Sequence, residues 1–145
     1  MSEDKISEST TCMRHIDPKL NESGWDLEKI IREYRITNGQ IVPSGKSGVR
    51  NKPLIADYIL QLGPDCKIAV VEAKAFDLPH DQGMQQALIY AKKMNLKFAY
   101  STNGQKIEEY DFITKQQRTI DKFPTPQELL ERIKGHLDFN DEVRK

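Results

Sequence analysis

Charged side chains interrupt a hydrophobic segment at residues 67–76, KIAVVEAKAF, where Glu72 and Lys74 follow a run of apolar residues. Such a run is typical of a strand in the middle of a sheet, where charged side chains are unfavourable unless they are paired. Residues two apart in a strand share a face, so Glu72 and Lys74 point the same way and the small Ala73 points to the opposite side. The segment therefore places a carboxylate and an amine together on one face of a sheet.

A second carboxylate is expected nearby. Asp57 lies within residues 54–62, LIADYILQL, and the turn residues GPD at 63–65 predict a hairpin with residues 67–76. The hairpin brings Asp57 near Glu72, and two close carboxylates repel each other, which raises a carboxylate pKa or recruits a cation. An oxygen-only site with open water positions suits Mg²⁺ or Mn²⁺. A lysine beside such a metal would orient or deprotonate a water and offset charge on a phosphate under attack, as hydrolysis of a phosphodiester requires.

The same residues also have a simpler interpretation. A Glu-x-Lys on a strand is usually a solvated ion pair that contributes little to stability, and one neighbouring Asp adds modest weight to a metal site. Gln86 and Tyr90 form a further polar pair, because residues four apart share a face of the helix expected after the hairpin. For an isolated pair of this kind, a tyrosine that fills the core is the ordinary interpretation. Spacing alone therefore leaves both interpretations open.

Helical segments are expected at the start of the chain. Residues 8–34 are expected to form two helical pieces, interrupted at Pro18 and Gly24, and residues 1–7 a disordered leader. The second piece, WDLEKIIREYRI at residues 25–36, is inferred from apolar residues at helical spacing. Those residues are Leu27, Ile30, Ile31 and Tyr34.

The remaining elements follow from alternation, turn residues and capping. Thr125 predicts the start of a C-terminal helix, with Pro126 at its first position and Glu128 three residues on. The other expected elements are an exposed loop at 43–53, strands at 54–62 and 67–76, a helix at 80–94, strands at 96–102 and 106–113 joined by an Asn103-Gly104 turn, and the helix at 123–137. The order helix, three strands, helix, strands and helix predicts an α/β fold, with a mixed central sheet flanked by helices.

Length and composition limit the class of protein. A chain of 145 residues is expected to form one domain, and equal totals of 22 basic and 22 acidic residues give no basic signature of a nucleic-acid binder. Cys12 and Cys66 lie far apart, which predicts neither a zinc site nor a disulfide scaffold. A polar N-terminus and the lack of a long apolar run predict a soluble protein of the reducing cytoplasm, without a membrane partner.

Taken together, the motifs resemble those of a known superfamily. The segments ADYIL, VVEAKA and QALIY are similar to the Asp, Glu-x-Lys and Gln-xxx-Tyr motifs of PD-(D/E)XK nucleases. The gap of 14 residues from Glu72 to Gln86 resembles the form found in the restriction (R) subunit of type I restriction-modification enzymes. Residues 7–25 resemble that family's opening segment, and STNGQKIEEYD and FPTPQEL resemble its closing segments. The resemblance extends over roughly residues 7 to 131.

The resemblance implies a restriction-endonuclease-like core and assigns a role to each motif residue. Asp57 and Glu72 would ligate Mg²⁺ or Mn²⁺ through their carboxylates, with the backbone carbonyl of Ala73 as a further ligand. Lys74 would be the catalytic lysine. The chain departs from the pattern at Ala56, where the superfamily has Pro, but this position is not a ligand.

The other site residues implied by the resemblance lie on helices. Gln86 and Tyr90 match the family's Gln-xxx-Tyr pair, which lies near the active centre and is associated with DNA positioning. Glu8 matches the acidic residue of the first helix, which often completes the site in this family. His80 is the histidine nearest to these motifs, just before the helix that carries Gln86.

The resemblance further implies the N-terminal endonuclease domain of a type I R subunit, with residues 1–145 as a single nuclease domain that is a fragment of a larger motor nuclease or a small stand-alone relative. A GxxxxGK[ST] motif is absent, and GKSG at 45–48 lacks its first glycine, so ATP would be bound only by motor domains missing from this chain. The implied activity is Mg²⁺-dependent hydrolysis of double-stranded DNA after ATP-driven translocation. The implied partners are that DNA and the methylation and specificity subunits of the parent complex.

Two alternatives of other classes remain open. The chain could be a catalytically silent DNA-binding module of the same fold, or an accessory domain that docks other subunits. In the loop at 44–52, Lys46, Arg50 and Lys52 are candidates for contact with a DNA backbone, although a solvated loop is the commoner fate of such charges.

Overall fold

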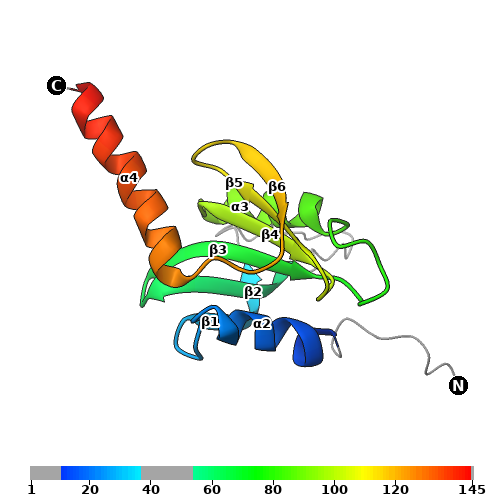
Figure 1. Cartoon of the computed structure of the whole chain (residues 1–145). Coiled ribbons are helices and arrows are strands. Elements are labelled where there is room, and N and C mark those ends of the chain that lie inside the picture. Colours follow the sequence, from blue (N-terminus) through cyan, green and yellow to red (C-terminus); the bar gives the residue numbers. More distant parts are fainter. Residues whose placement is uncertain (1–10, 37–53, 145) are drawn as a thin grey trace, which may run out of the picture.

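The computed structural model describes residues 11–36 and 54–144, apart from the side chains of Met13 and of residues 137–144. The expected leader at 1–7, Glu8 and the basic loop at 44–52 lie outside the described residues. The elements, shown in Figure 1, are η1 (Cys12–Ile16, a short π-helix), α2 (Asp17–Glu22), β1 (Ile30–Ile36), β2 (Leu54–Gly63), β3 (Cys66–Ala73), α3 (Met84–Met94), β4 (Phe98–Thr102), β5 (Ile107–Asp111), β6 (Gln116–Ile120) and α4 (Pro126–Arg144).

The described strands form one mixed sheet in the order β1-β2-β3-β4-β5-β6. Neighbouring strands are antiparallel except for β3 and β4, which run parallel. Parallel neighbours need a long crossover connection, and the segment that contains α3 supplies it. The predicted α/β class with a mixed central sheet is confirmed.

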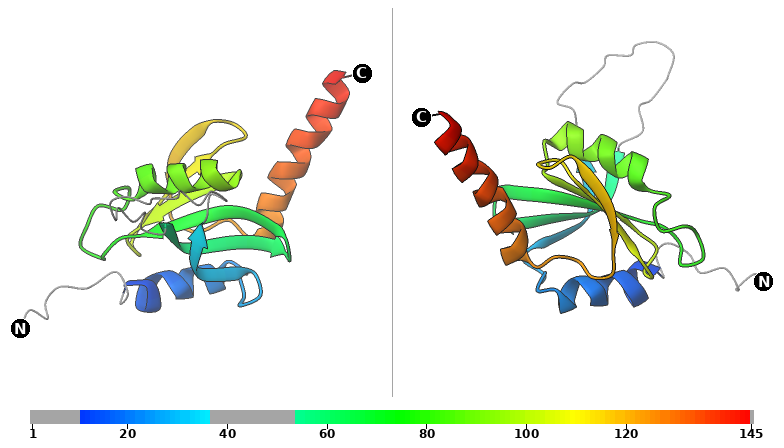
Figure 2. Two further views of the ribbon diagram at one scale, coloured as in Figure 1. Left: turned by 180° about the vertical axis from the view of Figure 1, so that it is seen from behind. Right: turned by 45° about the horizontal axis from the view of Figure 1, so that its top comes forward.

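Helices cover both faces of this sheet (Figure 2). On one face, η1 and α2 contribute Ile16 and Leu20 to a core that also contains Tyr58 and Tyr100. On the other face, α3 packs the side chains of its buried residues against β2, β3 and β4. The start of α4 is anchored by the buried Leu129, and the rest of this helix extends away from the sheet (Figure 1).

The helix predicted over residues 25–36 is wrong. Residues 30–36 form strand β1, which pairs antiparallel with β2 from Ile30 opposite Leu60 to Ile36 opposite Leu54. Ile30 and Ile36 are buried, whereas Leu27 is 75% exposed, so the apolar residues do not share one helical face. Pairing with β2 overrides the local periodicity, because β-branched and aromatic residues fit a strand at least as well as a helix.

The other predicted elements are present, with one addition. The hairpin of β2 and β3, helix α3, strands β4 and β5 and the turn at Gly104 lie where they were expected. The capping of α4 is also confirmed, since Thr125 Oγ1 accepts the Glu128 N–H at 3.0 Å and Glu128 Oε1 accepts the Thr125 N–H at 2.8 Å. Strand β6 was not predicted, because its exposed polar residues show no apolar alternation.

In the described part of the chain, no helix is both long enough and apolar enough to cross a membrane.

Candidate active site

Asp57 and Glu72 face each other where β2 and β3 end their regular pairing. Tyr58 pairs with Val71, and one further step of this register places Asp57 opposite Glu72. At this step the side chains bond across the strands: the Asp57 N–H donates to Glu72 Oε2 at 3.1 Å, and the Ala73 N–H donates to Asp57 Oδ2 at 2.8 Å. The two carboxylates are therefore held against the sheet backbone, and the close approach expected from the hairpin is present.

Lys74 follows the last residue of β3 and lies on the same side as Glu72. Its N–H donates to the Thr102 carbonyl of the parallel strand β4 at 2.9 Å, which fixes the backbone at this point. A Cβ built on Gly83 would lie 3.2 Å from Glu72 Cβ and 3.3 Å from Lys74 Cε. Both side chains therefore approach the same glycine at the start of α3.

Helix α3 brings the Gln-xxx-Tyr pair to the carboxylates. The Gln86 side-chain amide donates to the hydroxyl of Tyr90, which is only 3% exposed. Burial raises the pKa of Tyr90, the Gln86 hydrogen bond lowers it, and the negative charges of Glu72 and Asp57 raise it further, so that the pKa lies above its ordinary value. The tyrosine therefore lies within the electrostatic range of both carboxylates.

The donor set at this point fits a hard divalent cation. Asp57 and Glu72 supply two carboxylates, and Mg²⁺ is usually held by one or two carboxylates with water completing its shell. Along the part of the chain that the structure describes, no three His, Cys, Asp or Glu side chains gather as a metal site. Further ligands among the described residues would therefore be backbone oxygens, such as that of Ala73, and the expected contribution of Glu8 lies outside these residues.

A polar row continues from Glu72 across the same face of the sheet. Glu72 pairs with Ser101 of β4, Ser101 pairs with Glu108 of β5, and Glu108 pairs with Thr119 of β6. Ser101 is completely buried, and Glu108 is 8% exposed. Sequence reasoning missed this row, because its members are brought together by the register of strands that are distant in sequence.

Glu108 is fully engaged by neighbouring donors. It accepts from Thr119 Oγ1 at 2.6 Å and from Gln117 Nε2 at 2.8 Å, and it bonds to His80 Nε2 at 2.9 Å. Burial raises the pKa of Glu108, but the hydrogen bonds from Thr119, Gln117 and His80 outweigh burial and hold the pKa below its ordinary value. His80 is thus tied to the sheet beside the candidate site.

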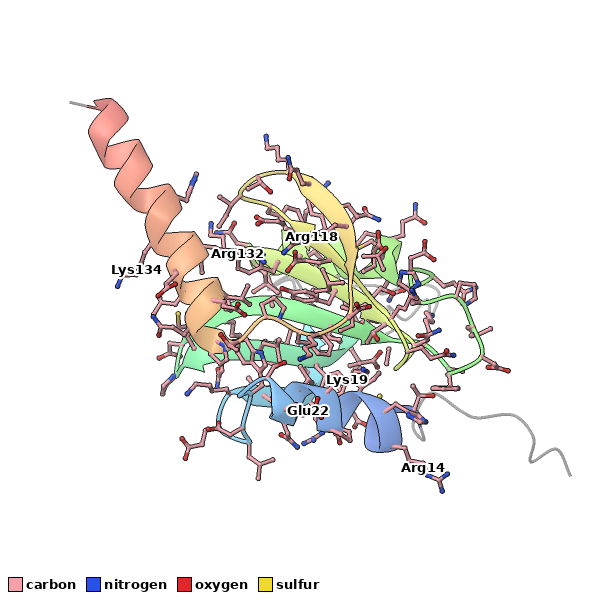
Figure 3. All side chains as sticks on the ribbon, in the orientation of Figure 1. Arg14, Lys19, Glu22, Arg118, Arg132 and Lys134 are labelled. Atoms are coloured by element: carbon pink, nitrogen blue, oxygen red, sulfur yellow. The ribbon has the colours of Figure 1, made fainter. Side chains whose placement is uncertain are left out.

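A second cluster of charges lies on the opposite face of the sheet. Glu109 is 1% exposed and accepts from Tyr100 Oη at 2.8 Å, from Arg118 Nε at 2.8 Å and from Arg132 Nη1 at 3.1 Å. Arg118 of β6 and Arg132 of α4 thus approach one carboxylate from two elements (Figure 3). A cavity of about 690 Å³ lies beside this cluster. Because these donors and acceptors are paired with one another, the cluster fastens α4 to the sheet and offers less to a ligand than the Asp57 and Glu72 site.

Proteins of similar sequence and fold include two subunits of type I restriction enzymes. No protein-family model matches the sequence. A solved fragment assigned as the HsdR subunit of a type I restriction enzyme from Vibrio vulnificus YJ016 has a TM-score of 0.82 and 43% identity, over 91% of this chain and 26% of that chain. The curated endonuclease subunit of the type I restriction enzyme EcoAI from Escherichia coli is 31% identical over 135 residues, 88% of this chain and 17% of that protein.

The fold is therefore the α/β fold of a type I restriction subunit fragment. The chain is a homologue of HsdR endonuclease subunits, which confirms the resemblance seen in the motifs. It spans 17% of the length of the curated relative and 26% of the solved chain.

Proposed function

We propose that this chain is the divalent-metal-dependent DNA endonuclease domain of a type I restriction R subunit. The observation that carries the proposal is the convergence of three side chains, those of Asp57, Glu72 and Lys74, beside the Gln86 and Tyr90 pair of α3. The homology to endonuclease subunits supports the same activity. A docking or silent binding domain has no need for two facing carboxylates and a lysine at one point of a sheet.

The carboxylates and the lysine have separate tasks in this proposal. Asp57 and Glu72 hold Mg²⁺ or Mn²⁺, with the Ala73 carbonyl as a further ligand. When bound, the metal supplies Lewis-acid stabilisation of the phosphate and lowers the pKa of a water. Lys74 contributes a positive charge that orients the attacking water and offsets negative charge on the phosphate under attack. Cross-strand hydrogen bonds to backbone N–H groups fix the carboxylates before substrate arrives, which limits the reorganisation needed for reaction.

Helix α3 contributes contacts to DNA in this proposal. Since the pKa of Tyr90 is raised, its phenol stays protonated at neutral pH and keeps an O–H that can donate to a phosphate oxygen. The Gln86 amide has two N–H groups, so it can hold the Tyr90 hydroxyl and still donate to DNA. The pair would position the duplex over the carboxylates.

The wider role follows from the proposed family activity. The substrate is double-stranded DNA, and in the parent enzyme cleavage follows ATP-driven translocation by motor domains that are not in this chain. The methylation and specificity subunits are the proposed partners, and the cytoplasm is the proposed location.

Cleavage of double-stranded DNA by the parent R subunit, reassembled with its methylation and specificity subunits and supplied with ATP and Mg²⁺ or Mn²⁺, tests this proposal. Wild type should cut, and Lys74→Ala should lose cleavage while it remains folded by circular dichroism and retains DNA binding. Lys67→Ala is the matched control, because Lys67 lies on the same strand but its Nζ is 5.6 Å from the ring centre of Tyr34 on β1. Cleavage by Lys74→Ala at the wild-type rate would refute the proposal, and loss of folding in Lys74→Ala would support a structural role instead.

A further inference from the structure

The connection from β3 to α3 links the two halves of the candidate site. We call residues 74–83 the connecting loop. It begins with Lys74 and ends at Gly83, immediately before the helix that carries Gln86 and Tyr90. The loop swings out beyond the ends of β3 and β4 before it returns to α3 (Figure 1). Its conformation therefore decides where both the lysine and the helix lie relative to the carboxylates.

The connecting loop is fastened along its length by β4 and by the turn that follows it. Backbone groups of the loop, spaced two or three residues apart, bond to this part of the sheet. The bonds are Lys74 N–H to Thr102 O at 2.9 Å, Gln105 Nε2 to Phe76 O at 2.9 Å, Asn103 Nδ2 to Leu78 O at 2.6 Å, Ser101 Oγ to His80 O at 2.7 Å and Gly83 N–H to Ser101 Oγ at 3.0 Å.

Ser101 occupies the central position in this arrangement. Its completely buried hydroxyl donates to the His80 carbonyl and accepts from the Gly83 N–H, so that one side chain holds two points of the loop. Gly83 is packed so tightly that an added Cβ would lie 3.0 Å from Ser101 Oγ and 3.2 Å from Glu72 Cβ. The serine thus sets how closely the start of α3 approaches the site.

The Asn103 side-chain amide bonds to the connecting loop through Nδ2 and to the turn after β4 through Oδ1. Its Oδ1 accepts the N–H groups of Gln105 at 2.9 Å and Lys106 at 3.2 Å, which closes the turn after β4. Its Nδ2 donates to the Leu78 carbonyl. A change from amide to carboxylate keeps an acceptor for the turn and removes the donor to the loop, so the two tasks can be separated experimentally.

We propose that Ser101 and Asn103 are positioning residues of the nuclease site. They act through the connecting loop and place Lys74 and α3 against the two carboxylates. The inference rests on the proposed nuclease function. Without these bonds the loop carbonyls would bond to water and the loop would sample other conformations, and a displacement of about 1 Å at a reacting group lowers rate by about a hundredfold.

The test compares Ser101→Ala and Asn103→Asp with wild type, with Lys74→Ala and with two matched controls. Ser23→Ala makes the same change at a buried serine after α2, on the opposite face, and Gln61→Glu makes an amide-to-carboxylate change near the β2–β3 turn. The measurements are the single-turnover cleavage rate, the affinity for DNA, the affinity for Mn²⁺ by calorimetry, and hydrogen exchange of the Gly83 amide.

We expect the cleavage rate of Ser101→Ala and of Asn103→Asp to fall about tenfold or more, because Lys74 and α3 are no longer held in a single position relative to the carboxylates. Affinity for Mn²⁺ should stay within about twofold of wild type, since the carboxylates are held by β2 and β3 rather than by the loop. Affinity for DNA should fall, because α3 carries the proposed DNA contacts Gln86 and Tyr90. The Gly83 amide should exchange faster in Ser101→Ala, because its acceptor is lost. The two matched controls should cleave like wild type.

Two results would overturn the inference. One is wild-type cleavage by Ser101→Ala and Asn103→Asp, with wild type active and Lys74→Ala inactive. The other is a loss of Mn²⁺ affinity that parallels the loss of rate, since this would show that the bonds support the whole fold of the site. By contrast, a reassembled wild-type complex that does not cut, or a Lys74→Ala complex that cuts normally, would refute the nuclease function itself, and the inference would fall with it.

Discussion

Asp57→Asn should stabilise the metal-free chain while it removes cleavage. The variant keeps a side-chain oxygen to accept the Ala73 N–H, which bonds Asp57 Oδ2 at 2.8 Å in the wild type, but it removes one of two facing charges. Directly opposed residues on antiparallel strands have Cβ atoms about 5 Å apart, and two unit charges at that distance repel by about 3 kcal/mol at an effective dielectric constant of about 20.

Two effects reduce this gain. The bond to the Ala73 N–H changes from charged to neutral, a loss of about 1 kcal/mol. The Lys74 side chain, like that of Glu72, approaches Gly83, and its positive charge offsets part of the repulsion. The net stabilisation should be about 1 kcal/mol, which corresponds to a rise in melting temperature of about 4 °C for a domain of this size.

Thermal denaturation with and without saturating Mg²⁺ measures both parts of this prediction. A metal that binds only the folded state stabilises it by about 3 kcal/mol at one hundred times its Kd. Saturating Mg²⁺ should therefore raise the melting temperature of the wild type above that of Asp57→Asn, which reverses the order seen without metal. Asp65→Asn is the control, because Asp65 is exposed at the other end of the hairpin and its φ of +65° is tolerated by Asn. A metal-free Asp57→Asn that melts below wild type, with an equal Mg²⁺ shift in both proteins, would refute the reasoning.

Two further predictions concern stability. Glu108→Gln should flatten the acid dependence of the melting temperature. Hydrogen bonds hold the pKa of Glu108 in the folded state below its ordinary value of 4.5. The wild type therefore has the full stabilisation from this carboxylate above pH 4.5 and loses that stabilisation as the pH falls through the folded-state pKa. Equal slopes for the two proteins from neutral to acid pH would contradict this. Gly104→Ala should lower the free energy of unfolding, measured by chemical denaturation, by about 2 kcal/mol or more. The reason is that φ at this position is +89° and the new Cβ would lie 2.5 Å from His15 Cβ. Gly135→Ala should instead gain up to about 1 kcal/mol in the free energy of unfolding, because among the described atoms outside its own helix backbone none lies within 4 Å of the added Cβ. A Gly104→Ala as stable as wild type would contradict the packing argument.

The grouping of Asp57, Glu72 and Lys74 could be predicted, because these residues are close together in the sequence. Glu72 and Lys74 are two residues apart on a strand, and a short turn joins that strand to the one that carries Asp57. Period-two alternation and one hairpin turn are enough to bring these three side chains together. Gln86 and Tyr90 follow on the next helix, whose periodicity is clear.

The rest depends on contacts between distant segments. Residues 30–36 carry apolar residues that fit a helix or a strand, and only pairing with β2 decides between them. Ser101 and Asn103 have no distinctive local pattern, because their partners lie in the connecting loop and are set by the register of β3 and β4. An Asn-Gly turn at Asn103 could be predicted. The bond from Asn103 Nδ2 to the Leu78 carbonyl could not, because no sequence pattern links these two residues.

The measurement that tests the central claim most directly is calorimetric titration of Mn²⁺ into wild type and Glu72→Gln, with circular dichroism to show that both are folded. Glu108→Gln is the matched control, since Glu108 is another buried glutamate in the same row across the sheet. The proposed site predicts binding to wild type and to Glu108→Gln, and none to Glu72→Gln. Equal binding by all three proteins, or binding by none of them, would contradict a metal site between Asp57 and Glu72.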